Sequence, residues 1–161
     1  MSHAHLRSGM KIAIVSGHFN PLHVGHIAYM EAARSCADAL WVIVANDIQV
    51  ALKGRKSFML LDDRMKIVES LRVVDRAFAS TDMDRSSCAS LRFVGKLATD
   101  IGKTIYVNGG DSTKDSIPKC EIDICNELGI ELVFGIVPQI AQSSAIIESY
   151  ESSQNIERQN T

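Results

Sequence analysis

Short apolar runs alternate with longer segments of helical periodicity along this chain. Five runs rich in apolar and mostly β-branched residues predict strands, over residues 11–16, 40–45, 76–80, 103–107 and 131–137. Between these runs, apolar residues recur at helical spacing over residues 24–36, 61–73, 87–98 and 117–128. Strands that alternate with helices favour right-handed crossovers. The pattern therefore predicts an α/β fold, with a doubly wound sheet of five parallel strands and helices on both faces.

The length of 161 residues fits a single domain. We expect that domain to span residues 11–150. Residues 1–10 would be an N-terminal extension or a remnant of expression cloning, and residues 151–161 a polar C-terminal tail. Hydrophobic residues make up 46% and charged residues 22%, which is ordinary for a globular chain and excludes intrinsic disorder.

The charge balance excludes a general attraction to nucleic acid. Lys and Arg number 17 against 19 Asp and Glu, so any phosphate binding must come from a focused site. Because no apolar run approaches the ~20 residues of a membrane-spanning helix, we expect no membrane partner. The four cysteines lack metal-ligand spacing and no secretory signal precedes the first strand, so we expect four reduced thiols in a cytoplasmic protein.

Residues 17–26, GHFNPLHVGH, hold three of the five histidines of the chain. They follow the first predicted strand and open the first predicted helix, where free backbone N–H groups and the helix dipole favour phosphate. His23 and His26 lie one helical step apart on the same face. Two imidazoles in that arrangement can donate hydrogen bonds to phosphate oxygens as charge builds up in a transition state. Gly25 between them permits a close approach of backbone or ligand.

This segment resembles the signature G-x-F-[DN]-P-x-H-x-G-H of the cytidylyltransferase-like nucleotidyltransferase superfamily. The resemblance implies a Rossmann-like nucleotidyltransferase domain over residues 11–150, with His23 and His26 as catalytic residues that contact the nucleotide phosphates. Asn20 stands where many members have Asp, and His18 replaces the usual Thr, Ser or Tyr. The nucleotide-binding residues that the resemblance implies in this segment are Gly17, His18, Phe19, Asn20 and Gly25.

Three further segments extend the resemblance over nearly all of residues 11–150. Lys53, in the loop after the second strand, resembles a family lysine that reaches the triphosphate from a lid, and the resemblance makes it the third catalytic residue. Arg64 matches an arginine that usually lies near the nucleotide. Asn108, Gly109, Gly110 and Asp111 resemble a V-K-G-G-D stretch that lines the nucleoside, with Asn in place of Lys. Gln142, Ser143 and Ser144 occupy the place of a serine motif that holds the β- and γ-phosphates.

The resemblance implies transfer of NMP from an NTP, either CTP or ATP, to a phosphorylated small sugar or polyol, with release of pyrophosphate. Mg²⁺ would be carried mainly by the nucleotide, because the sequence shows no carboxylate cage for a metal site. Two alternatives stay open: a coenzyme-type adenylyltransferase that acts on pantetheine phosphate or nicotinamide mononucleotide, and a non-catalytic nucleotide-binding module. A homodimer is compatible with an apolar edge that we expect around Val73, Val74 and Phe78.

Overall fold

The computed structural model describes residues 6–54, 56–110 and 112–136. Its strands are β1 (Ile12–Gly17), β2 (Ala39–Val44), β3 (Arg76–Ala79), β4 (Thr104–Asn108) and β5 (Glu131–Phe134). Its helices are α1 (Val24–Ser35), α2 (Asp47–Leu52), α3 (Leu61–Glu69), α4 (Cys88–Ile101) and α5 (Lys119–Leu128). The predicted site residues Asp111, Gln142, Ser143 and Ser144 lie outside the described residues, as do residues 1–5 and the predicted tail.

All five strands form one parallel sheet in the order β3-β2-β1-β4-β5. The chain builds outward from β1 to β3 on one side, and β4 and β5 then follow on the other side of β1. This arrangement confirms the predicted doubly wound, Rossmann-like fold. The strand order reverses between β1 and β4, and ligands of such sheets bind beyond the carboxyl ends of the strands at that place.

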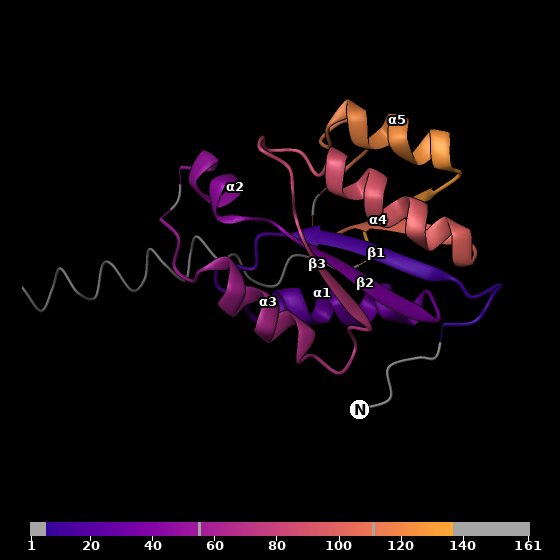
Figure 1. Cartoon of the computed structure of the whole chain (residues 1–161), viewed down its shortest axis with the longest axis horizontal. Coiled ribbons are helices and arrows are strands. Elements are labelled where there is room, and N and C mark those ends of the chain that lie inside the picture. The colour runs from indigo at the N-terminus through magenta and orange to yellow at the C-terminus, as the bar shows by residue number, and fades with distance from the viewer. Residues whose placement is uncertain (1–5, 55, 111, 137–161) are drawn as a thin grey trace, which may run out of the picture.

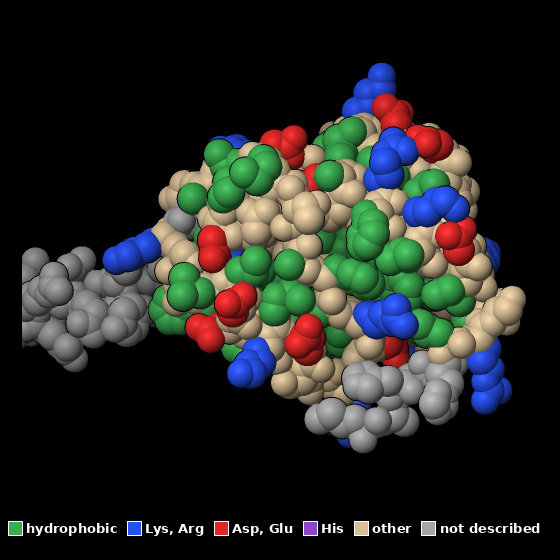
Figure 2. Space-filling view, viewed as in Figure 1, with side chains coloured by type: hydrophobic (Ala, Val, Ile, Leu, Met, Phe, Trp, Pro, Cys, Tyr) green, Lys and Arg blue, Asp and Glu red, His purple; other side chains and the backbone are tan. Residues whose placement is uncertain are grey.

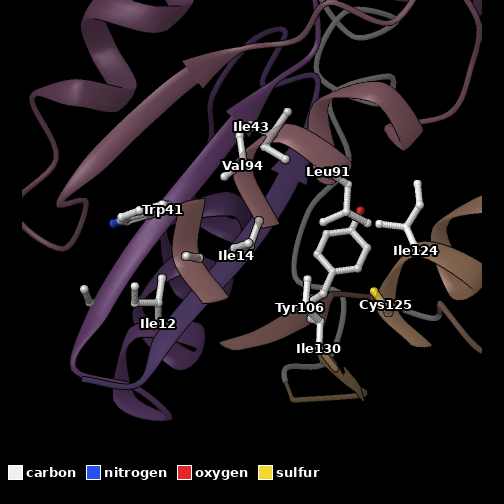
Figure 3. Packing of buried hydrophobic residues seen from close by; sticks show 12 residues of the cluster. Ile12, Ile14, Trp41, Ile43, Leu91, Val94, Tyr106, Ile124, Cys125 and Ile130 are labelled. Carbon is white, nitrogen blue, oxygen red and sulfur yellow. The ribbon is translucent and has the colours of Figure 1, made fainter. Parts of the chain in front are cut away.

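Helices cover both faces of the sheet, with α4 and α5 on one side and α1 and α3 on the other (Figure 1). Because side chains alternate along a strand, each buried strand supplies both cores. Ile12, Ile14 and Trp41 pack under α4 and α5 in the first core (Figure 3), while Ala13 and Val15 pack against α1 and α3 in the second. All six residues of β2 are buried, which explains why its sequence is continuously apolar.

The helices differ most from the prediction in the segment between β2 and β3. Residues 47–52 form α2, which was not predicted, because Asn46 and Gln49 make a capping box that starts a helix directly after β2. The segment predicted as a helix over residues 61–73 ends at Glu69, and Ser70 is its C-cap. The apolar edge expected at Val73, Val74 and Phe78 is also smaller than predicted, since Val74 is only 4% exposed. Figure 2 instead shows apolar side chains gathered over α4 and β3, where Phe93 is 61% exposed.

The expectation of four reduced thiols is wrong for two of the cysteines. Cys88, at the start of α4, and Cys120, at the start of α5, form a disulfide with Cα atoms 6.0 Å apart. The two residues are 32 positions apart in the chain, and the packing of α4 against α5 brings them together. Cys36 and Cys125 are free. Among the described residues, no helix is both long enough and apolar enough to cross a membrane.

Candidate active site

The loop after β1 folds back so that an aromatic ring covers a glycine. Phe19 has a positive φ of 50°, and the peptide bond between Asn20 and Pro21 is cis. A Cβ atom placed on Gly17 would lie 2.7 Å from Cζ of Phe19, which is too close for any side chain. Gly17 is therefore required by the packing of Phe19, a cause distinct from the phosphate contact that the resemblance implies.

His23 and His26 close the first turn of α1 in a reciprocal cap. Nδ1 of His23 accepts a hydrogen bond from the Gly25 N–H at 3.1 Å, and Nδ1 of His26 accepts one from the His23 N–H at 3.3 Å. The two rings are stacked, with centroids 3.8 Å apart and an angle of 22° between their planes. The spacing of two histidines in this loop therefore builds a capping box in which imidazoles replace the usual hydroxyl and carboxylate.

The caps determine which ring nitrogen carries the proton. Since Nδ1 of each ring accepts a backbone N–H, the neutral ring carries its hydrogen on Nε2. Burial, together with the nearby positive charges of His23 and His18, lowers the pKa of His26 to about 3. Burial also lowers the pKa of His23. At neutral pH, this turn therefore presents two uncharged imidazoles, each with one Nε2–H group that it can donate.

Asn20 holds the segment between α2 and α3 against the histidine loop. Its side chain is 2% exposed, and Oδ1 accepts the N–H groups of Phe58 and Met59 at 2.8 and 2.9 Å. Nδ2 donates to the carbonyl of Lys56 at 3.2 Å. All of these partners are backbone groups. Asn20 therefore positions residues 56–59, and its predicted contact with nucleotide stays a prediction.

Arg64 is buried beneath the carboxyl edge of the sheet, with 1% of its surface exposed. Its guanidinium donates to the carbonyls of His18 and Ala45 at 2.7 and 2.5 Å. It also donates to the Met59 carbonyl and pairs with Asp47 at 2.6 Å. Arg64 thus ties the ends of β1 and β2 to the starts of α2 and α3. These protein partners account for its position, so a direct role toward nucleotide stays a prediction.

Lys53 is exposed at the C-terminal end of α2. Its backbone forms the C-cap of that helix, so the residue follows a helical turn and not an open loop as expected. It lies beyond the carboxyl end of β2, on the same edge of the sheet as the histidine loop (Figure 1). Its reach toward a triphosphate stays a prediction.

The end of β4 holds an unpaired hydrogen-bond donor. Asn108 is 9% exposed, and its buried Nδ2 has no hydrogen-bond partner among the residues that the structure describes. A buried amide hydrogen without a partner costs roughly 1–3 kcal/mol, so such a group in a native fold points to a ligand or to bound water. Gly109 lies against the ring of Tyr29, since a Cβ there would be 2.7 Å from Tyr29 Cδ2, and Gly110 has a φ of 63°.

Tyr29 joins this end of β4 to α1, and it was not predicted as a site residue. Its hydroxyl donates to the Val107 carbonyl at 2.5 Å, while its ring covers Gly109. The residue lies three positions after His26 and therefore on the same face of α1, a spacing that could have revealed it. Tyr29 thus fixes the distance between the two segments that the resemblance assigns to phosphate and nucleoside.

The described residues contain no group of three or more His, Cys, Asp or Glu side chains that could hold a metal ion. That Mg²⁺ is carried mainly by the nucleotide stays a prediction.

Comparison with known proteins identifies a family for this chain. A family model described as Cytidylyltransferase-like matches residues 14–155. A FAD synthase of Methanocorpusculum labreanum is 40% identical over 75 residues, which are 47% of this chain and 53% of that protein. The chain thus matches about half the length of that relative. The Bifunctional protein HldE of Ectopseudomonas mendocina is 32% identical over 87% of this chain and 28% of its own length.

Solved structures share the fold. A structure described as the lipopolysaccharide core biosynthesis protein from Thermoplasma volcanium superimposes with a TM-score of 0.57 at 27% identity, over 78% of this chain and 94% of that one. A putative nicotinate-nucleotide adenylyltransferase from Vibrio parahaemolyticus, at 20% identity and a TM-score of 0.55, covers 84% of this chain and 77% of its own, and supports the fold alone. The match over residues 14–155 is decisive, and the chain belongs to the cytidylyltransferase-like family of nucleotidyltransferases.

Proposed function

We propose that this protein transfers NMP from an NTP to the phosphate of a small phosphorylated acceptor and releases pyrophosphate. The observation that carries the proposal is the pair of capped, neutral imidazoles of His23 and His26 beyond the end of β1. Donors fixed before substrate binds stabilise charge most effectively, because no reorganisation is needed during the reaction.

In the proposed reaction, an oxygen of the acceptor phosphate attacks the α-phosphorus of the NTP. The new P–O bond forms as the bond to the β-phosphate oxygen breaks, and pyrophosphate leaves with that electron pair. The Nε2–H groups of His23 and His26 donate to phosphate oxygens whose negative charge grows in the pentavalent transition state. No side chain has to remove a proton, because the acceptor phosphate is already anionic. Mg²⁺, when bound through the triphosphate, would neutralise part of its charge.

The nucleoside is assigned to the end of β4, next to the histidine loop. The unpaired Nδ2 of Asn108 supports this assignment, because a base or ribose oxygen would supply the missing acceptor. The backbone of Gly109 and Gly110 would lie alongside, with Asp111 completing the segment. Lys53 would approach the triphosphate from α2, and Gln142, Ser143 and Ser144 would bind its β- and γ-phosphates.

The donor and the acceptor are proposed from the relatives. FAD contains an AMP unit, so the similarity to FAD synthases favours ATP over CTP as the donor. The acceptor is proposed as a sugar or polyol phosphate, in line with the match to HldE over most of the chain, and FMN is the second candidate because of the FAD synthases. Both acceptors present a phosphate monoester, which is the chemistry that the site requires.

The experiment is a pyrophosphate-release assay with ATP and CTP against a panel of acceptors. The panel contains sugar-1-phosphates, glycerol 3-phosphate, FMN, pantetheine phosphate and nicotinamide mononucleotide. We expect release with ATP and one class of phosphate monoester, with the NDP-linked product identified by mass spectrometry. Nucleotide binding without turnover on any acceptor would identify a non-catalytic nucleotide-binding module instead.

A further inference from the structure

A buried chain of hydrogen bonds runs from the starts of α4 and α5 to the last residues of β1. The two oxygens of the Glu121 carboxylate accept the Ser87 N–H at 2.8 Å and the Tyr106 hydroxyl at 3.1 Å. Oη of Tyr106 lies 2.8 Å from Oγ of Ser16. Since Tyr106 donates its proton to Glu121, it accepts from Ser16, and all three side chains have a defined orientation.

This chain of hydrogen bonds lies in the core of the protein. Glu121 is 4% exposed and Tyr106 is 1% exposed, and the ring of Tyr106 lies among Leu91, Ile124 and Ile130 (Figure 3). Burial raises the pKa of the Glu121 carboxyl above its usual range. A buried carboxyl group costs stability unless its oxygens are satisfied, and both oxygens of Glu121 have partners here.

Two links hold Glu121 between the helix starts. One is the hydrogen bond from Ser87, and the other is the disulfide between Cys88 and Cys120, the residues next to Ser87 and Glu121 in the chain. The carboxylate is thus anchored to a rigid part of the molecule on the α4 and α5 face. Through the Tyr106 hydroxyl it is linked, on the same face of the sheet, to Ser16, which is the residue before Gly17.

Contacts continue from Ser16 to the candidate catalytic histidine. Gly17 lies under the ring of Phe19, close enough that a Cβ would clash. The edge of the Phe19 ring meets the ring of His26, with centroids 5.0 Å apart and planes 77° apart. A displacement of Ser16 would therefore shift Gly17, its neighbour in the chain. Because Gly17 packs against Phe19 and Phe19 packs against His26, the imidazole of His26 would shift as well.

We propose that Glu121, Tyr106 and Ser16 are positioning residues for His26, acting through Gly17 and Phe19. This inference rests on the proposed function, in which His26 stabilises the transition state. None of the three side chains has to touch substrate, because each acts through the next.

The first test is kinetic and uses Tyr106→Phe and Ser16→Ala, each of which removes one hydroxyl from the chain. With the acceptor that turns over fastest in the panel, each variant should lower kcat about tenfold, because small displacements of a catalytic group have large rate effects. The KM for ATP should stay within about twofold. Because both changes break the same chain, the double variant should lose no more than the larger single loss.

Thr104→Val is the matched control. Thr104 is a buried residue of the same strand as Tyr106, 2% exposed, and its hydroxyl donates to the Gly102 carbonyl at the end of β4 away from the site. Thr104→Val removes this buried hydroxyl and should lower the free energy of unfolding, but it should leave kcat unchanged. Glu121→Gln should retain more kcat than Glu121→Ala, since a carboxamide oxygen can still accept the Ser87 N–H.

The second test needs no substrate. In protein with ¹³C-labelled histidine, Tyr106→Phe and Ser16→Ala should shift the ring signals of His26, and Thr104→Val should leave them in place. Unchanged His26 signals in both of the first two variants would overturn the inference. The inference also predicts that Tyr106→Phe has no effect on kcat in a protein that already carries His26→Asn, because the group that Tyr106 positions is then gone. A loss of kcat as large in that background as in the wild type would overturn the inference. A wild-type kcat in His26→Asn alone would instead overturn the proposed function, while the His26 signals still test the hydrogen-bond chain.

Discussion

The rings of His23 and His26 are stacked 3.8 Å apart, and each Nδ1 accepts a backbone N–H of the turn in which the two residues lie. The same two side chains thus start α1 and present their Nε2–H groups as donors. The two roles use different atoms of each ring, so single substitutions can separate them.

Two substitutions at His26 should separate its role as a helix cap from its role as a hydrogen-bond donor to phosphate. Asn places Oδ1 where Nδ1 of His26 lies, so His26→Asn should keep the cap and remove only the Nε2–H group, whereas His26→Ala loses both. We expect kcat to fall about 10²- to 10³-fold in both variants, as for the loss of one transition-state donor. The free energy of unfolding should fall by about 0.5–2 kcal/mol in His26→Ala only.

Steady-state kinetics and urea denaturation at pH 7.5 measure the two effects. Equal stabilities for the Asn and Ala variants would show that the cap contributes nothing. A kcat near the wild-type value in His26→Asn would remove His26 from the reaction.

Stability should fall as the pH drops from 6.5 toward 3, because of the buried histidine. The pKa of His26 is about 3 in the folded protein and near 6.5 in the unfolded chain, so between these values the unfolded chain binds a proton that the folded protein does not. The contribution of the neutral ring is complete above pH 6.5 and is lost below it, by at most about 1.4 kcal/mol per pH unit. Urea denaturation of wild type and His26→Asn at pH 7.5 and 5.0 measures the difference. The variant should lose less stability than the wild type, and parallel losses would contradict the prediction.

Asn20 should control the order of residues 56–59. Asn20→Ala leaves the N–H groups of Phe58 and Met59 without their acceptor, at a cost of about 1–3 kcal/mol for the segment. Hydrogen exchange at these two amides should accelerate strongly, while the amides of β2 keep their protection. Asn20→Asp, which keeps an acceptor oxygen, is the matched control and should accelerate exchange less. Unaltered exchange at Phe58 and Met59 in Asn20→Ala would show that the segment is held by other contacts.

The side chain of Asn108 should contribute to the affinity for nucleotide and not to the stability of the fold. Leu has the branched shape of Asn at Cγ but no amide, and Nδ2 of Asn108 has no hydrogen-bond partner to lose among the described residues. We expect Asn108→Leu to leave the unfolding free energy within about 1 kcal/mol of wild type and to weaken ATP binding about tenfold, or 1.4 kcal/mol. Calorimetric titration with ATP and thermal denaturation measure the two quantities. Unchanged ATP affinity would show that the nucleoside does not bind at the end of β4.

The disulfide should contribute measurably to stability. Cys88 and Cys120 are 32 positions apart, and closing a chain segment of this length typically stabilises a fold by about 2–4 kcal/mol. Reduction with a dithiol, or Cys88→Ser, should therefore lower Tm, and the reductant should have no further effect on Cys88→Ser. Cys36→Ser, at an exposed free cysteine, is the matched control and should leave Tm unchanged. Identical Tm values with and without reductant in the wild type would contradict the prediction.

The sequence predicted the centre of the sheet well because β1, β2 and β4 are largely buried and therefore read as continuous apolar runs. The histidine loop was found because ten neighbouring residues carry the family signature. Local spacing did not reveal α2, whose start depends on the capping pair Asn46 and Gln49. Contacts between distant segments left no signal in the periodicity, which is why the disulfide of Cys88 with Cys120 and the partners of Arg64 became visible only in the folded chain.

The measurement that tests the central claim most directly follows the phosphorus atoms of ATP. With ATP labelled at the α-phosphate, the account predicts that the label moves into the acceptor product. With ATP labelled at the γ-phosphate, it predicts that the label leaves in pyrophosphate. Label from the γ-phosphate on the acceptor, or release of the γ-phosphate as inorganic phosphate, would show cleavage at a different bond and would contradict NMP transfer at this site.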